Sequence, residues 1–226
     1  AKEIIVTGDR FIDGMQLLHI GTKTSEALCK YWEQELISLF HCIGKRYLYD
    51  KKHVTQVERL SLLMFDKLAK HYGMGERERL LLRGAAIVHD LGKYICMRSH
   101  SSHTYELIMA TDIIGFSDRD KKIIALAAYY HANKLFDRTN TKAPAIDKDM
   151  VAVVAKLAAI LRLADALDRS YLQKIRQCSV NIKDNAMVVQ ATSKNDLALE
   201  EWTFAAKASF FEEVYGLEAV LQRVED

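Results

Sequence analysis

Apolar residues recur at spacings of three and four along most of this chain, and that periodicity favours a mainly α-helical fold. In residues 24–46 the apolar stripe consists of Leu28, Trp32, Leu36, Leu39 and Ile43. The same pattern predicts further helices over residues 53–73, 76–89, 103–114, 118–131 and 149–172. The chain's single proline, Pro144, falls in a predicted loop, as expected because proline disrupts the interior of a helix.

The spacing of the apolar residues changes after residue 170. Polar and apolar side chains alternate from Ser179 onward, interrupted by Asp184-Asn185, and this pattern predicts a β-hairpin. A helix over residues 203–216 and a short strand or tail over residues 217–224 are expected to follow. We therefore expect residues 171–226 to form a small α+β subdomain after the helical domain.

The first residues look like the end of another domain. Residues 3–7 have the composition of one short strand, and one strand cannot fold alone. The expected organisation is a remnant of an upstream domain at 1–20, a helical domain at 21–170 and the α+β subdomain at 171–226.

Composition argues against several classes of function. The formal net charge of +2 over 226 residues is too small to favour duplex nucleic acid or a membrane surface as a partner. No apolar run approaches the roughly 20 residues that a membrane span needs. The four cysteines are scattered without a CxxC spacing, which favours free thiols in the cytoplasm.

An adjacent His89-Asp90 pair ends the apolar run of the helix at 76–89, and Lys93 follows it closely. An imidazole and a carboxylate at a buried helix end need a partner, and a divalent metal ion suits both. Other predicted helices supply further inward-facing ligands of the same types, at His53, His103, His131 and Asp165.

This set of residues points to hydrolysis of a phosphate bond. Asp90 would bridge two ions while His89 binds one of them, and two ions about 3.5–4 Å apart activate water for direct attack on phosphorus. Asp90 and Lys93 are therefore the expected catalytic residues, and Lys93, Arg169 and Arg162 the expected substrate-binding residues. Mixed imidazole and carboxylate ligands do not distinguish Mn, Fe, Mg, Zn, Co or Ni.

The same residues also have interpretations without a metal. His89 and Asp90 would then form a hydrogen-bonded structural pair, and His131 would interact with a helix dipole. Lys93 would stabilise the C-terminal end of its own helix. For His103 the sequence hardly favours metal binding over a role without a metal.

Nearby polar residues have simpler expected roles. Asp168 is expected to support Asp165, and His100 to lie in solvent or to contact substrate. Arg162 and Arg169 would otherwise form surface ion pairs.

The order of His53, His89-Asp90 and Asp165 resembles the HD superfamily of metal-dependent phosphohydrolases, and His103 and His131 resemble the ligands of its two-metal members. Two longer segments, Gly84-Ala-Ala-Ile-Val-His-Asp-Leu-Gly-Lys93 and Leu161-Arg-Leu-Ala-Asp-Ala-Leu-Asp-Arg-Ser170, resemble the C-terminal half of the exopolyphosphatase/guanosine pentaphosphate phosphatase (Ppx/GppA) family. Residues 4–14 are similar to the place where that family's actin-like domain ends. Residues 199–204 and 210–216 are similar to its terminal subdomain.

The resemblance implies an HD-type helical bundle and one or two divalent metal ions. It implies a phosphohydrolase that acts on polyphosphate or a phosphorylated nucleotide, in a homodimer. In that family the exopolyphosphatase site belongs to N-terminal domains with Gly-rich phosphate loops, which are not visible in this sequence. The alternative is therefore a non-catalytic module that binds polyphosphate or nucleotide, or dimerises, on behalf of those domains.

Overall fold

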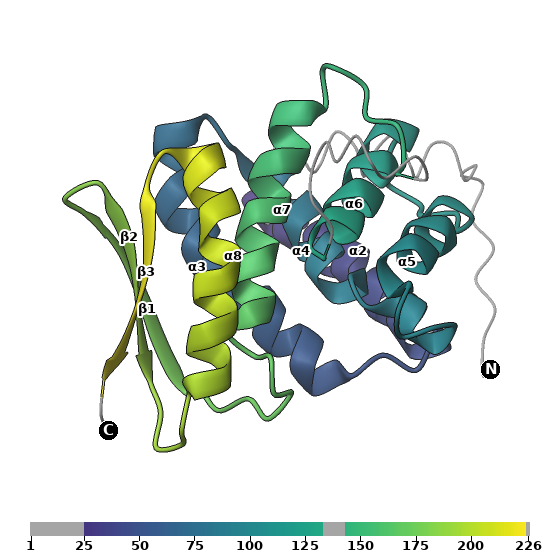
Figure 1. Cartoon of the computed structure of the whole chain (residues 1–226). Coiled ribbons are helices and arrows are strands. Elements are labelled where there is room, and N and C mark those ends of the chain that lie inside the picture. The colour runs from purple at the N-terminus through teal and green to yellow at the C-terminus, as the bar shows by residue number, and fades with distance from the viewer. Residues whose placement is uncertain (1–24, 133–142, 225–226) are drawn as a thin grey trace, which may run out of the picture. The chain divides into compact units, whose positions relative to one another are not determined.

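The computed structural model describes residues 25–132 and 143–224 (Figure 1). The chain divides into two compact units, residues 1–39 and 40–226. The described helices are α2 (Glu26–Arg46), α3 (Lys51–Tyr72), α4 (Glu76–Val88), the 3-10 helix η1 (Leu91–Tyr94), α5 (His100–Met109), α6 (Asp118–Tyr130), α7 (Val151–Ala166) and α8 (Ala198–Tyr215). The strands are β1 (Gln177–Lys183), β2 (Ala186–Thr192) and β3 (Glu218–Val224).

The prediction of a mainly α-helical chain with a small α+β part at its C-terminus is confirmed. The strand expected at residues 3–7, and with it the remnant at 1–20, lies outside the described residues, as does most of the loop before Pro144. Residues 40–226 group as one unit, and the expected division at residue 170 stays a prediction.

Helix α7 lies at the centre of the second unit, where it packs against α3, α6 and α8. Its Ala-, Leu- and Ile-rich sequence is apolar around most of its circumference, as expected of a helix surrounded by neighbours. Leu157, Ile160, Leu161 and Leu163 are fully buried. Asp165 is also buried, close to the C-terminal end of this helix.

The sheet follows α7 and contains the predicted hairpin. Strands β1 and β2 are antiparallel and joined at Asp184-Asn185, both of which adopt the left-handed backbone conformation of a tight turn. Strand β3 pairs in parallel with β2, and α8 forms the connection between them. In Figure 1 the sheet lies beside α3 and α8, and contacts join β3 to α8 and β1 to α3.

Several helix boundaries differ from those predicted. Helix α7 ends at Ala166 instead of residue 172, and α8 begins at Ala198 instead of residue 203. Helix α5 spans His100–Met109 instead of residues 103–114, so it begins three residues earlier than expected. The start of α5 packs closely on Gly92 of η1, where a Cβ would lie 1.9 Å from the carbonyl oxygen of His100. The Gly92 N–H donates to Thr104 Oγ1 at 2.8 Å, so the first turn of α5 packs directly on η1.

Two further properties concern the cysteines and the length of the apolar helices. All four cysteines are free thiols. Within residues 25–132 and 143–224, none of the helices is both long and apolar enough to cross a bilayer.

Candidate metal centre

Five helical segments of the second unit bring polar side chains to one place. His53 lies in the first turn of α3, which begins where the Asp50 carboxylate accepts hydrogen bonds from the Lys52 and His53 N–H groups. The other residues lie at or near helix ends: His89 and Asp90 after α4, His100 at the start of α5, His131 after α6, and Asp165 and Asp168 at the end of α7. Helix ends can present imidazole and carboxylate groups inward without interrupting the apolar faces that pack the bundle.

The first group of potential ligands comprises His53, His89 and Asp90, whose ligand atoms all lie within 4.8 Å of one another. Asp90 Oδ2 is 3.7 Å from His53 Nε2 and 3.4 Å from His89 Nε2. Asp165 Oδ1 adds a second carboxylate, at 3.5 Å from His53 Nε2 and 3.7 Å from His89 Nε2. These separations suit atoms that share an ion, because bonds from a metal such as zinc to nitrogen and oxygen are about 2.0–2.2 Å long.

The second group comprises Asp90, His100 and His131. Asp90 Oδ1 is 3.6 Å from His100 Nε2 and 3.9 Å from His131 Nε2, and the two Nε2 atoms are 3.4 Å apart. Asp90 therefore belongs to both groups, with Oδ2 towards the first and Oδ1 towards the second. A carboxylate in this position can bridge two cations.

The hydrogen bonds at Nδ1 orient all four imidazoles. Carbonyl oxygens accept from His89 Nδ1 at 2.8 Å, His131 Nδ1 at 2.5 Å and His100 Nδ1 at 3.0 Å, while Asp168 Oδ2 accepts from His53 Nδ1 at 2.8 Å. Since these oxygens only accept, each Nδ1 carries a proton, and in the neutral ring the lone pair is on Nε2. Metal-binding histidines are oriented in the same way by a carbonyl or carboxylate behind the ring.

Three buried atoms of the cluster have no hydrogen-bond partner among the described residues, namely His53 Nε2, His89 Nε2 and Asp90 Oδ1. An unsatisfied buried polar group costs about 1–3 kcal/mol. All three atoms face the interior of the cluster, so one divalent cation beside them would satisfy more than one. The donor set therefore fits a divalent cation.

The pKa values of these groups show how strongly they interact. Burial by itself would lower the pKa of His89, but the carboxylates of Asp90 and Asp165 raise it to about 10. Burial and the positive charge of His89 lower the pKa of His131 to about 3, which leaves its imidazole neutral. Burial opposes ionisation of Asp90, yet the neighbouring His89 holds the pKa of that carboxyl below its usual value. A divalent cation would replace the proton on His89, so metal binding would release protons.

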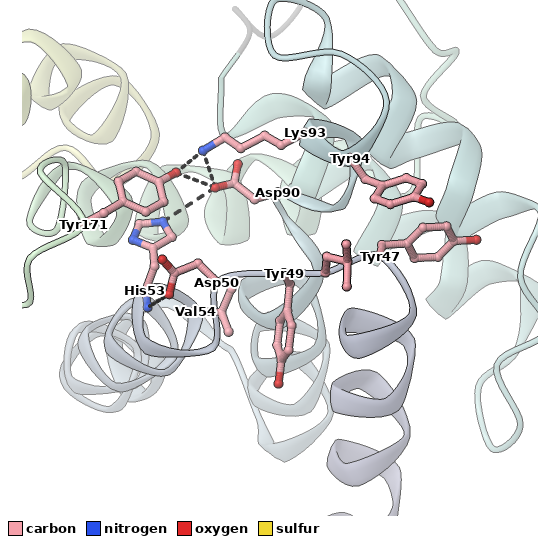
Figure 2. Close-up of a pocket in the computed structure, with 10 residues that line it drawn as sticks. Tyr47, Tyr49, Asp50, His53, Val54, Asp90, Lys93, Tyr94 and Tyr171 are labelled. Carbon is pink, nitrogen blue, oxygen red and sulfur yellow. Dashed lines mark hydrogen bonds and ion pairs between the residues drawn. The ribbon is translucent and has the colours of Figure 1, made fainter.

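Cationic and phenolic groups border the two carboxylates. Lys93 Nζ donates to Asp90 Oδ2 at 2.5 Å, and the Tyr171 hydroxyl donates to the same oxygen at 2.6 Å (Figure 2). Lys207 Nζ, from α8, is 2.6 Å from Asp165 Oδ2. The carboxylates are thus partly neutralised by ammonium groups that a metal ion or a phosphate would have to rearrange.

Two cavities adjoin Asp90 and Lys93 on different sides. The first has a volume of about 230 Å³, and its other walls include the aromatic rings of Tyr47, Tyr94 and Tyr171 (Figure 2). The second has a volume of about 240 Å³ and is lined by His100, His131, Asp165, Arg169, Trp202 and Lys207, among others. Asp90 and Lys93 therefore line both cavities.

The structure brings together most of the residues that the sequence predicts for the site. His53, His89, Asp90, His131 and Asp165 share the cluster, and Lys93 and Arg169 border it. His103 lies outside both groups, because its Nδ1 faces Glu106 Oε2 at 3.4 Å. Arg162 lies with its guanidinium 4.8 Å from the centre of the Phe210 ring and does not line either cavity.

Sequence reasoning missed three residues of the site. His100, expected in solvent or against substrate, occupies the position foreseen for His103, and its side chain is only 19% exposed. Tyr171 and Lys207 were not singled out, because neither stands in a motif and only tertiary packing brings them to Asp90 and Asp165. The one available signal was the His-Ser-Ser-His spacing of residues 100–103, which offers two alternative ligands.

Residues 40–210 match the family model described as Ppx/GppA phosphatase, domain III. Every residue of the cluster falls within that range. Among curated proteins, the chain is 26% identical over 137 residues to the guanosine-5'-triphosphate,3'-diphosphate pyrophosphatase of Aeromonas salmonicida, a match that covers 60% of this chain and 26% of that protein. It is 27% identical over 120 residues to the protein of the same name from Aeromonas hydrophila, covering 53% of this chain and 24% of that protein. The chain thus spans about a quarter of the length of these relatives.

Proposed function

This chain belongs to the Ppx/GppA phosphatase family, and from that premise we propose that its His/Asp cluster binds one or two divalent metal ions and hydrolyses phosphate bonds. The proposed substrates are polyphosphate or a phosphorylated nucleotide, and the bonds cleaved are phosphoanhydrides or phosphoesters. Membership of the HD superfamily and assembly as a homodimer stay predictions from the sequence resemblance.

One observation carries the proposal: four imidazoles, each fixed through Nδ1, direct Nε2 towards the two oxygens of Asp90. A structural hydrogen-bond network would be expected to satisfy its buried atoms, whereas here His53 Nε2, His89 Nε2 and Asp90 Oδ1 lack partners among the described residues. Ligation explains both the common direction of the rings and the unsatisfied atoms.

Divalent ions held by these residues would lower the pKa of a bound water and withdraw charge from phosphoryl oxygens. Asp90 would hold the two ions together, with one carboxylate oxygen towards each group. Lys93 and Arg169 border the cluster and would orient the oxygens of a phosphate chain through charge-assisted hydrogen bonds.

A second candidate function is supported by the ion pairs of the cluster. Lys93 pairs with Asp90 and Lys207 pairs with Asp165, so the described residues themselves neutralise much of the carboxylate charge. Such a cluster would suit a module that binds polyphosphate or nucleotide without cleaving it, in support of other domains. The partial coverage of the longer relatives is consistent with this alternative.

The deciding experiment measures metal content and catalysis on the same preparation. We expect the purified chain to retain one or two divalent ions and to release phosphate from polyphosphate, guanosine pentaphosphate or simple nucleotides in the presence of Mn²⁺, Mg²⁺ or Fe²⁺. Asp90→Asn should lose both properties, because Asp90 takes part in both ligand groups.

The matched control is Asp66→Asn, which changes a half-exposed carboxylate that pairs with Arg79. This variant should retain metal and activity. Bound metal without phosphate release from any of these substrates would favour the binding module. Phosphate release that survives Asp90→Asn would contradict the proposed hydrolase.

A further inference from the structure

The turn that follows α7 has a strained backbone. Tyr171 and Gln173 have φ values of 60° and 47°, in the left-handed region that non-glycine residues seldom adopt. Neither is Asn or Asp, whose short side chains ease this conformation. A strained conformation of this kind persists only where the surrounding contacts hold it, and such positions cluster at functional sites.

Two buried carboxylates hold the turn. Asp168 Oδ1 accepts from the Gln173 N–H at 2.8 Å, and Asp168 Oδ2 accepts from Gln173 Nε2 at 3.0 Å. On α8, the fully buried Glu200 accepts from the Ser170 N–H at 3.1 Å and pairs with Lys174 at 3.1 Å. The backbone of the turn is therefore held by hydrogen bonds on both sides of Tyr171.

The Tyr171 side chain lies directly against the His/Asp cluster (Figure 2). Its ring stacks on the His53 imidazole, with 3.7 Å between the centroids and 21° between the planes. Its hydroxyl donates to Asp90 Oδ2 at 2.6 Å and also contacts Lys93 Nζ. Tyr171 thus contacts two potential metal ligands, His53 of α3 and Asp90 after α4.

We propose that Tyr171 is a positioning residue that fixes the orientation of the Asp90 carboxylate and of the His53 ring for metal binding. This inference rests on the proposed function. The hydroxyl holds Asp90 Oδ2 on the side of His53 and His89, which turns Oδ1 towards His100 and His131. The stacked ring keeps the His53 plane aligned, while Asp168 fixes the same imidazole from its Nδ1 side.

The contacts of the hydroxyl and of the ring can be separated by substitution. Tyr171→Phe removes the hydroxyl contacts with Asp90 and Lys93 but keeps the ring on His53, so it tests the contribution of the hydroxyl apart from that of the ring. Because the ring and the backbone contacts of the turn remain, this variant is expected to fold.

The matched control is Tyr72→Phe, in the last turn of α3. The Tyr72 hydroxyl donates to the backbone carbonyl of Tyr215 at 2.5 Å, so this variant also loses one hydrogen bond, but away from the cluster. Circular dichroism and thermal unfolding of both variants report any general loss of structure.

The experiment titrates metal-free protein with Co²⁺ and follows its visible absorption, which depends on the geometry of the ligands. We expect Tyr171→Phe to need about tenfold more Co²⁺ for half-saturation, since losing the partner of a metal ligand typically weakens affinity about 10–100-fold. The shape or intensity of the cobalt bands should also change. Tyr72→Phe should keep both the midpoint and the spectrum of the wild-type protein.

Two outcomes separate this inference from the proposed function. If the wild-type protein binds Co²⁺ and Tyr171→Phe binds it with the same or higher affinity and an unchanged spectrum, the positioning role is overturned and the proposed function stands. If the wild-type protein does not bind Co²⁺, the proposed function is overturned together with the inference.

Discussion

Asp168 Oδ2 accepts a hydrogen bond of 2.8 Å from His53 Nδ1, although 115 residues separate the two along the chain. His53 lies in the first turn of α3 and Asp168 follows α7, so this bond joins two segments whose helices pack together. Both side chains are fully buried. The bond keeps the Nε2 of His53 directed at Asp90 and Asp165.

Asp168→Asn should therefore weaken metal binding without removing a ligand. The amide that replaces the carboxylate is neutral, so it forms a weaker hydrogen bond with His53 Nδ1 and orients the ring less firmly. The electron pair of His53 Nε2 then binds a metal ion less strongly. We expect the affinity for Mn²⁺, measured by titration calorimetry, to fall about 10–100-fold. Asp66→Asn serves as the control, and an affinity equal to that of the wild-type protein would contradict the role of Asp168.

The two histidines of α5 offer a second test. His100 Nε2 lies 3.6 Å from Asp90 Oδ1, whereas His103 faces Glu106. His100→Ala should lower the number of bound ions per chain, because it removes a ligand of the second group only and leaves the first group intact. His103→Ala should leave the number unchanged. Metal analysis after equilibrium dialysis measures both, and loss of an ion in His103→Ala instead would show that α5 presents the other histidine.

The comparison of these two histidines shows what periodicity can predict and what it cannot. The apolar stripe of α3 correctly placed His53 on the inward face, because burial follows directly from the spacing of three and four. The start of α5 lies three residues before the first residue that the apolar pattern indicated, and its first turn packs on Gly92, a contact that the pattern does not predict. The sequence therefore predicted an α5 histidine in the site but identified His103 where the structure presents His100.

The residues that surround the ligands were harder to predict for a related reason. Tyr171 reaches Asp90 only because α7 ends at Ala166 and a left-handed turn follows, whereas the periodicity extended that helix to residue 172. Lys207 lies on α8, whose weak amphipathic pattern gives no indication of which face meets Asp165. Contacts of this kind depend on tertiary packing between segments distant in sequence.

Gly92→Ala should destabilise the fold around the site. The new Cβ would lie 1.9 Å from the His100 carbonyl oxygen and 2.6 Å from the Thr104 nitrogen, and both are backbone atoms that cannot move aside alone. We expect the free energy of unfolding in urea to fall by about 1–3 kcal/mol, the usual cost of overpacking. Gly75→Ala is the control, because the nearest atom to its Cβ would be Glu78 Oε2 at 3.6 Å. Equal stability of the two variants would contradict the close packing of η1 on α5.

The interactions at the N-terminus of α6 predict that stability depends on pH at a place away from the His/Asp cluster. Ser117 and Asp120 form a reciprocal capping box, and Arg77 Nε donates to Asp120 Oδ1 at 3.1 Å. Burial would raise the pKa of Asp120, but the hydrogen bonds from Arg77 and Ser117 lower it below its usual value. The folded protein therefore favours the ionised carboxylate more than the unfolded chain does.

Asp120→Asn should consequently be less stable than the wild-type protein at pH 7, by about 1 kcal/mol as is typical for the loss of a helix cap. A carboxyl whose folded pKa is depressed stabilises fully above its unfolded pKa of about 3.9, and this stabilisation is lost as the pH falls through the folded pKa. The difference between the two proteins, measured by urea unfolding, should therefore shrink as the pH is lowered from about 5 towards 3. The exposed Asp118, in the same first turn, provides the control Asp118→Asn, for which a smaller loss is expected because only a helix-dipole interaction changes. A difference between wild-type protein and Asp120→Asn that stays constant down to the acid transition would contradict the depressed pKa of Asp120.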